Sequence, residues 1–169
     1  MDNDRDTVIN ESRTKLENAS GYSQIWTVVK DTAESSTGRR RRSMMLFLDD
    51  LPIRLGAYHP LGTNNIVLNR TLVQIVEATG KSKRVVNALI YNLLLHEYLH
   101  ALGRLSEQEV RDQVYETSRK CFGERHITTV IAQRSPWTLL KDVQLESAGL
   151  PKRVMEIVKD FEKSDRYIV

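Results

Sequence analysis

The segment from Val85 to Leu102 constrains the fold more than any other stretch, because it is apolar on nearly every side of a helix. A helix that is apolar all round has to be buried, so other elements must surround it. Along this helix, Asn92, His96 and His100 recur at steps of four residues and form a polar stripe. Buried polar groups cost free energy unless partners satisfy them, so the stripe indicates a specific site on the helix.

Residues 96–100 read His-Glu-Tyr-Leu-His, which is a His-Glu-x-x-His motif. On a helix, His96 and His100 share one face and can direct two imidazoles at one tetrahedral Zn²⁺. Glu97 would then lie beside the metal, in the position of a general base. The alternative is an ordinary buried helix with two hydrogen-bonded histidines and a salt-bridged glutamate. The motif is among the more specific short patterns, so it favours a zinc site.

Composition favours one soluble globular domain. The chain has 169 residues, of which 40% are hydrophobic and 28% charged, as is typical of globular proteins. Its single cysteine, Cys121, excludes an internal disulfide framework. The charged first residues contain no apolar signal core, and no window reaches the roughly 18 apolar residues that span a bilayer. We therefore expect a cytoplasmic protein that does not associate with membranes.

Periodicity and turn residues predict a helix-rich α+β fold. Helices are expected over residues 5–18, 22–34, 71–79, 83–102 and 106–121 and, after prolines, over 136–147 and 151–163. Strands are expected over 44–48, 52–58 and 65–69, which gives a small sheet of about three strands. Neither a repeat nor a linker divides the chain, so residues 1–169 are interpreted as one domain in which residues 124–169 form C-terminal helices.

A run of four arginines, Arg39 to Arg42, follows residues 35–38, whose composition is typical of a loop. Without this run the formal net charge of +3 would be close to zero. Such a run can contact nucleic acid or an acidic partner. No aromatic residues interleave to stack on bases, so a solvated loop is favoured and nucleic-acid binding is not expected.

A catalytic zinc ion usually has three protein ligands, so one more ligand should follow His100. Metzincins place a histidine six residues on, where this chain has Ser106, and the neighbouring candidates are Glu107 and Glu109. Helical phase places Glu107 on the same inward stripe as Val110, whereas Glu109 is turned away by about 200°. Ser106 and Glu109 also have the spacing of a capping box. We therefore favour Glu107 as the third ligand, with Glu109 as the alternative.

With these residues in view, the chain resembles the gluzincin clan of zinc metallopeptidases, and most closely the minigluzincins. In that clan, HExxH on one helix is completed by a glutamate on the next. The likeness covers about residues 44–121 and includes LGAYHPLGTNNIVLNR, HEYLHALG and SEQEVR. It implies a catalytic core over 44–121, in which a short sheet packs on the motif helix. It also implies an edge strand, over 65–69 or 54–58, that binds extended peptide.

Two positions, Val110 and Arg111, depart from the pattern of the families that the chain resembles. Their ligand glutamate opens an E-x-x-A-[DN] string, whereas this chain continues from Glu107 to Val110 and Arg111. The missing acidic or amide group would normally orient a ligating histidine, so Asp112 or Asn92 would have to replace it.

The resulting expectation is a zinc-dependent endopeptidase, or a latent form of one, that acts on a peptide or protein. Zn²⁺ would be held by His96, His100 and Glu107, and Glu97 would be the general base. The alternative is a catalytically weak or inactive metal-binding domain that regulates or binds a partner.

The group that would stabilise the oxyanion is less well defined. Tyr58 and His59 are candidates because they lie beside Pro60 in the strand region. A packing or solvent-facing role is favoured for both.

Overall fold

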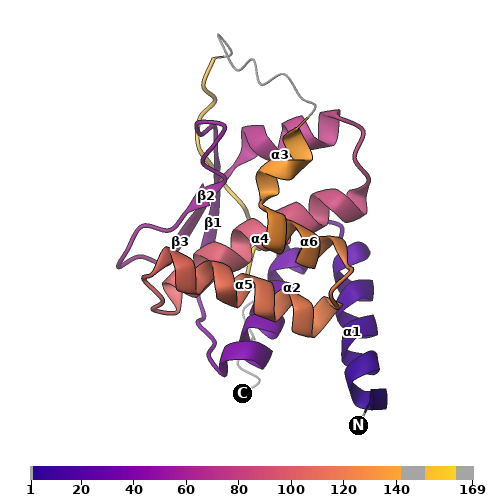
Figure 1. Ribbon diagram of the computed structural model, residues 1–169. Helices are drawn as coiled ribbons and strands as arrows, with labels where there is room; N and C mark the ends of the chain where they lie inside the picture. Colours follow the sequence, from indigo (N-terminus) through magenta and orange to yellow (C-terminus); the bar gives the residue numbers. More distant parts are fainter. Residues whose placement is uncertain (1, 142–150, 163–169) are drawn as a thin grey trace.

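Helix α4 (Lys83–Ala101) lies at the centre of the computed structural model, with a small sheet on one side and helices on the other (Figure 1). The structure describes residues 2–141 and 151–162. Every α4 residue from Val86 to Leu95 is buried, as the apolar sequence requires. The Ser82 hydroxyl accepts a hydrogen bond from the Val85 N–H and caps the helix, which confirms its predicted start.

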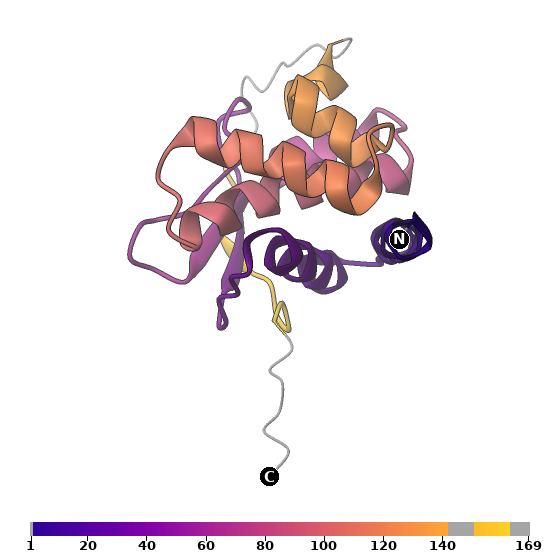
Figure 2. The same ribbon diagram turned by 60° about the horizontal axis from the view of Figure 1, so that its bottom comes forward.

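Five further α-helices surround α4 in the described part of the chain. They are α1 (Asp2–Glu17), α2 (Tyr22–Thr37), α3 (Arg70–Ala78), α5 (Glu107–Phe122) and α6 (Ile127–Arg134), followed by a 3₁₀ turn, η1 (Pro136–Leu140). In Figure 2, α1 and α2 lie on one side of α4, with α5 and α6 on another. Among these helices none is both long and apolar enough to cross a membrane.

Helices α2 and α6 differ from the predictions. Helix α2 continues through Thr37 and ends at Gly38, which has a left-handed φ of 70°, so residues 35–37 are not a loop. Helix α6 was not predicted, because its sequence, ITTVIAQR, is rich in β-branched residues that favour strands. The His126 side chain caps it by accepting a hydrogen bond from the Thr128 N–H. Capping and packing against α4 and α5 thus override the local preference.

The sheet has four strands in the order β2-β3-β1-β4. Strand β1 (Met45–Asp49) pairs in parallel with β3 (Asn65–Asn69), which is antiparallel to β2 (Ala57–Tyr58). β4 (Glu156–Ile157) is antiparallel to β1. The strand predicted over 52–58 is thus reduced to two residues. Because β3 lies inside the sheet, β2 is the edge strand on this side, and the expectation that 65–69 could be an edge is wrong.

The expected helix over residues 151–163 is wrong. The described part of this segment is extended and contains β4. Its apolar residues do not form one buried stripe, because Val154 and Ile157 are 87% and 48% exposed whereas Phe161 is buried. Pairing with β1 therefore prevails over helical periodicity. The helix predicted over 136–147 is reduced to η1, and residues 142–147 lie outside the described part.

Two carboxylates hold this C-terminal segment against the domain. Asp50, after β1, accepts hydrogen bonds from the Arg153 backbone and guanidinium and from Arg70 and Thr71. The bonds from Arg153, followed by those from Arg70 and Thr71, outweigh desolvation and hold the pKa of Asp50 far below its usual range. Glu162 accepts from Lys30 Nζ at 3.2 Å.

Phe161 provides the apolar anchor of the same segment. Its ring stacks on Trp26 with the centroids 4.7 Å apart, and Phe161 is only 4% exposed. We expect Phe161→Ala to lower the free energy of unfolding by about 3–5 kcal/mol, since it removes a buried ring and leaves a cavity. Val154→Ala, on the same segment but exposed, should change it by less than about 0.5 kcal/mol. Denaturant unfolding of both variants checks this, and equal effects would contradict the anchoring role.

Candidate metal centre

The structure brings His96, His100 and Glu107 together at one end of α4. His96 Nε2 lies 3.0 Å from Glu107 Oε2, and His100 Nε2 lies 2.8 Å from Glu107 Oε1. One ligand-capable atom from each residue lies within 4.8 Å of the others. The two histidines come from α4 and the glutamate from the first residue of α5. These three residues form a candidate metal-binding group.

A tight turn between α4 and α5 gives Glu107 its position. Gly103 has a φ of 102°, a conformation that favours glycine, and the Arg104 N–H then donates to the Leu99 carbonyl. The Ser106 hydroxyl accepts from the Glu109 N–H at 3.3 Å, so Ser106 caps α5, which begins at Glu107, one residue after the predicted start. No Glu109 side-chain bond back to Ser106 is present among the described residues, so only half of the expected capping box forms.

The arginine run supports the same end of α4. Arg39 Nη1 donates to the Leu102 carbonyl, and Arg41 Nη1 donates to the Ala101 carbonyl. These carbonyls belong to the last turn, where an α-helix leaves acceptors without partners and where cations are favoured. Arg40 pairs with two carboxylates of α2. Three of the four arginines therefore have a role within the fold.

Hydrogen bonding to the backbone sets the tautomer of His100. Its Nδ1 lies 2.7 Å from the Arg104 carbonyl oxygen, which can only accept, so Nδ1 carries a proton. In the neutral imidazole, Nε2 then presents a lone pair toward the Glu107 carboxylate 2.8 Å away. Two acceptors at this distance require a cation between them, either a proton on the ring or a metal ion. The donor set therefore fits a divalent metal.

The charge states of the group also suit a metal. Burial lowers the pKa of His96 and outweighs the opposing effect of Glu107, so the ring is neutral at pH 7. Burial acts to raise the pKa of Glu107, but the two histidines outweigh it and the pKa is lowered. Neutral imidazole and ionised carboxylate are the forms that coordinate metals.

Glu97 differs from Glu107 in its surroundings. It is buried, and burial, followed by the charge of Glu107, raises its pKa to about 8, against a hydrogen bond from the His59 backbone. A carboxyl group with a pKa near neutrality is suited to exchange protons with a reactant. Glu97 also lines the same cleft as His96 and Glu107.

This cleft, with a volume of about 610 Å³, extends from the metal-binding group between β2, α5 and α6. Its far wall includes Trp137 of η1, and three arginines line it: Arg54, Arg111 and Arg134. Sequence analysis did not single out Trp137, Arg54 or Arg134 as site residues. Their approach depends on how α6 and η1 pack, and α6 itself was not predicted.

The backbone of His59 contacts Glu97, but the side chains of the two candidate oxyanion residues do not face the cleft. Neither Tyr58 nor His59 lines the cleft, and His59 Nδ1 lies 2.8 Å from the Asn65 carbonyl oxygen in the neighbouring strand. The structure therefore favours a structural role for His59.

The residues expected to orient a histidine are also differently placed. Asp112 accepts from Gln108 on the exposed face of α5. Asn92 donates to the Ala88 and Thr128 carbonyls, and its Oδ1 has no partner within the described residues. The group that orients His100 is instead the Arg104 carbonyl, which no side-chain pattern could reveal.

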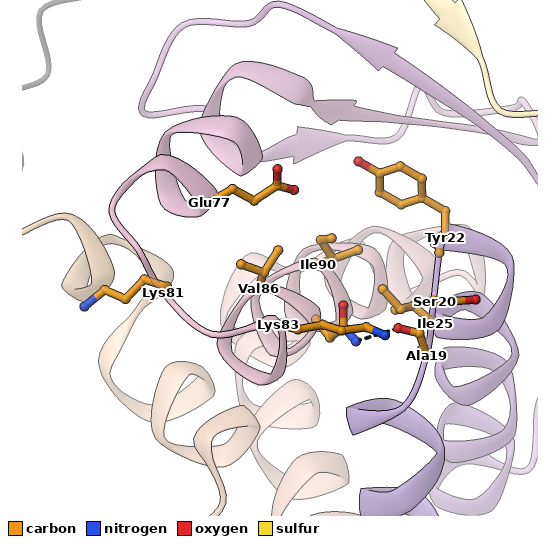
Figure 3. Close-up of a pocket in the computed structure, with 11 residues that line it drawn as sticks. Ala19, Ser20, Tyr22, Ile25, Glu77, Lys81, Lys83, Val86 and Ile90 are labelled. Carbon is orange, nitrogen blue, oxygen red and sulfur yellow. Dashed lines mark hydrogen bonds between the residues drawn. The ribbon is translucent and has the colours of Figure 1, made fainter.

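A second hollow, of about 400 Å³, lies at the other end of α4 (Figure 3). Ile25, Val86 and Ile90 give it an apolar floor, and Figure 3 shows the Glu77 carboxylate and the Tyr22 ring facing each other above it. Within residues 2–141 and 151–162, the only group of three or more potential metal ligands is that at His96, His100 and Glu107. The residues that could bind a metal or act in catalysis therefore lie at the first cleft.

Comparison of the chain with models of protein families, with curated proteins and with solved structures gives no match. Function has to be inferred from the site.

The geometry gives a direct test of the third ligand. Glu107→Ala should reduce zinc affinity by at least tenfold, because it removes the carboxylate that faces both Nε2 atoms. Glu109→Ala is the matched control on the same helical turn and should retain the affinity of the unmodified protein. Competition titration with a chromophoric chelator measures both. Unchanged affinity in Glu107→Ala, or equal losses in the two variants, would reject Glu107 as a ligand.

Proposed function

We propose that this protein is a zinc metallopeptidase of the gluzincin type, which hydrolyses peptide bonds in cytoplasmic peptides or proteins. The observation that carries the proposal is the single Glu107 carboxylate facing the Nε2 atoms of both motif histidines. Two imidazoles and one carboxylate, from HExxH and the next helix, are the ligand set of many catalytic zinc sites. The resemblance of residues 44–121 to minigluzincins supports the same conclusion.

The residues of this chain then have separate roles. His96, His100 and Glu107 would hold Zn²⁺. When bound, Zn²⁺ polarises the scissile carbonyl and lowers the pKa of water toward 7. Glu97 takes a proton from the attacking water and delivers it to the leaving amine. Its burial raises its pKa, which favours the delivery of the proton to the leaving amine.

Strand β2 supplies a surface for the substrate backbone. Gly56 and Ala57 line the cleft beside His96 and Glu97, and β2 is an edge strand. An extended peptide can pair with such an edge through its main chain. Gly56 permits the approach of this edge to α4, because a Cβ atom there would meet a Leu93 methyl carbon at 2.5 Å. The scissile bond would thereby pass close to the motif.

One observation favours the alternative of a weakly active or inactive metal-binding regulatory domain. Arg111 takes the place of the acidic or amide residue of related families and lines the cleft. Its charge contributes to lowering the pKa of His96 and would oppose a nearby metal cation. Metal binding without peptide hydrolysis would support this alternative.

The proposal is tested by Glu97→Gln. This variant should retain zinc, because Glu97 is not a ligand, and should hydrolyse peptides about 10²–10⁴-fold more slowly, because the proton acceptor is lost. Zinc content by mass spectrometry and initial rates on a peptide library check the two parts. Glu109→Gln makes the same chemical change outside the cleft and is the control. Hydrolysis by Glu97→Gln at the unmodified rate would refute the assigned base.

A further inference from the structure

Three exposed arginines, Arg54, Arg111 and Arg134, line the metal-site cleft without the ion pairs that several other arginines form among the described residues. Arg70 and Arg40 form ion pairs with carboxylates of the fold, at 3.2 Å for Arg70 and Asp50. No such pair involves Arg54, Arg111 or Arg134 in the described portion of the chain. Their guanidinium groups therefore have no counter-charge within 4 Å from that portion.

These arginines reach one cavity from three separate elements. Arg54 precedes β2, Arg111 lies one turn after Glu107 on α5, and Arg134 is the last residue of α6. The only acidic residues that line the same cavity are Glu97 and Glu107, and both belong to the proposed catalytic machinery. Apart from the metal-binding group and Glu97, the ionisable residues of the lining are therefore positive.

The cavity has further features of a binding site. Its volume of about 610 Å³ lies within the range of small-ligand sites. Trp137, Leu93 and Ile131 supply apolar surface. Asn92, which is 4% exposed, also lines it, and its Oδ1 accepts no hydrogen bond from the described residues. This acceptor is buried and adds polar character to the wall of the cavity.

We propose that this cleft binds a carboxylate of the substrate, so that the preferred substrates are acidic peptides; this substrate class rests on the proposed peptidase function. Guanidinium groups form paired, charge-assisted hydrogen bonds with carboxylates. The carboxylate is a Glu or Asp side chain close to the scissile bond or the free C-terminus of the peptide. Basic side chains are excluded by like charge.

Equilibrium binding tests the proposal without requiring catalysis. Fluorescein-labelled pentapeptides with Glu, Gln or Lys at the central position, blocked at both ends, are titrated with the full chain by fluorescence anisotropy. A second Gln peptide with a free C-terminus separates the two sources of carboxylate. Titrations are run with EDTA and with equimolar Zn²⁺. The Glu peptide or the free-terminus peptide should bind at least about tenfold more tightly than the blocked Gln peptide, and the Lys peptide least.

Charge-removing variants connect this preference to the cleft. Arg134→Gln and Arg54→Gln should reduce the preference for the carboxylate peptide by at least about threefold each, with less effect on the blocked Gln peptide. Arg125→Gln is the matched control, because Arg125 is exposed and does not line the cleft. Thermal unfolding checks that each variant is folded. If a variant does not fold, the peptide series on the unmodified protein still tests the preference for a carboxylate.

The outcomes separate the two proposals. Equal binding of Glu, Gln and Lys peptides, or a preference that persists in the double variant Arg54→Gln with Arg134→Gln, overturns the carboxylate site even where zinc-dependent hydrolysis is found. Carboxylate preference that depends on these arginines supports the site. If the protein shows the same preference and binds zinc but cleaves no peptide, the carboxylate site is supported and the peptidase function is rejected.

Discussion

The satisfaction of polar groups along a buried helix is the constraint on which the rest of this structure depends. An unsatisfied buried donor or acceptor costs about 1–3 kcal/mol, so most polar side chains of α4 have partners, the Asn92 Oδ1 being an exception among the described residues. Each partner ties down a different part of the chain. Asn87 binds carbonyls at the end of α1, Tyr91 binds Thr32 of α2, and Tyr98 binds the backbone of the arginine run. The polar residues of α4 thus fix the positions of the elements around it.

The metal-binding group follows from the same constraint at the end of α4 that opens into a cleft. The side chains of His96 and His100 are 24% and 12% exposed, so each still needs a partner, and the more exposed Glu107 supplies it. The arginine run and the turn at Gly103 hold this end of α4 in place. A metal ion bound only by the folded state would add its binding free energy to the stability of this end.

Features encoded within one helix were predictable from the sequence. The HExxH spacing, the Ser82 cap and the phase of Glu107 each depend on residues within a few turns of one another, and the structure places all three as expected. Features that depend on tertiary packing were not predictable. Helix α6 forms against its strand preference, and β4 forms where apolar periodicity indicated a helix. The cleft arginines meet only because α5, α6 and the β2 loop converge.

Arg111 shows how a residue of one helix and the tertiary packing around it depend on each other. An acidic or amide side chain at position 111 could accept a hydrogen bond from an imidazole, whereas a guanidinium has only donors. In this chain the Arg104 carbonyl accepts from His100, because the turn after Gly103 returns the backbone to α4. Residue 111 therefore does not have to orient His100. An arginine can occupy this position because its side chain is exposed and lines an open cleft. The orientation of His100 is thus provided by the backbone, while the side chain at 111 contributes to the charge of the cleft.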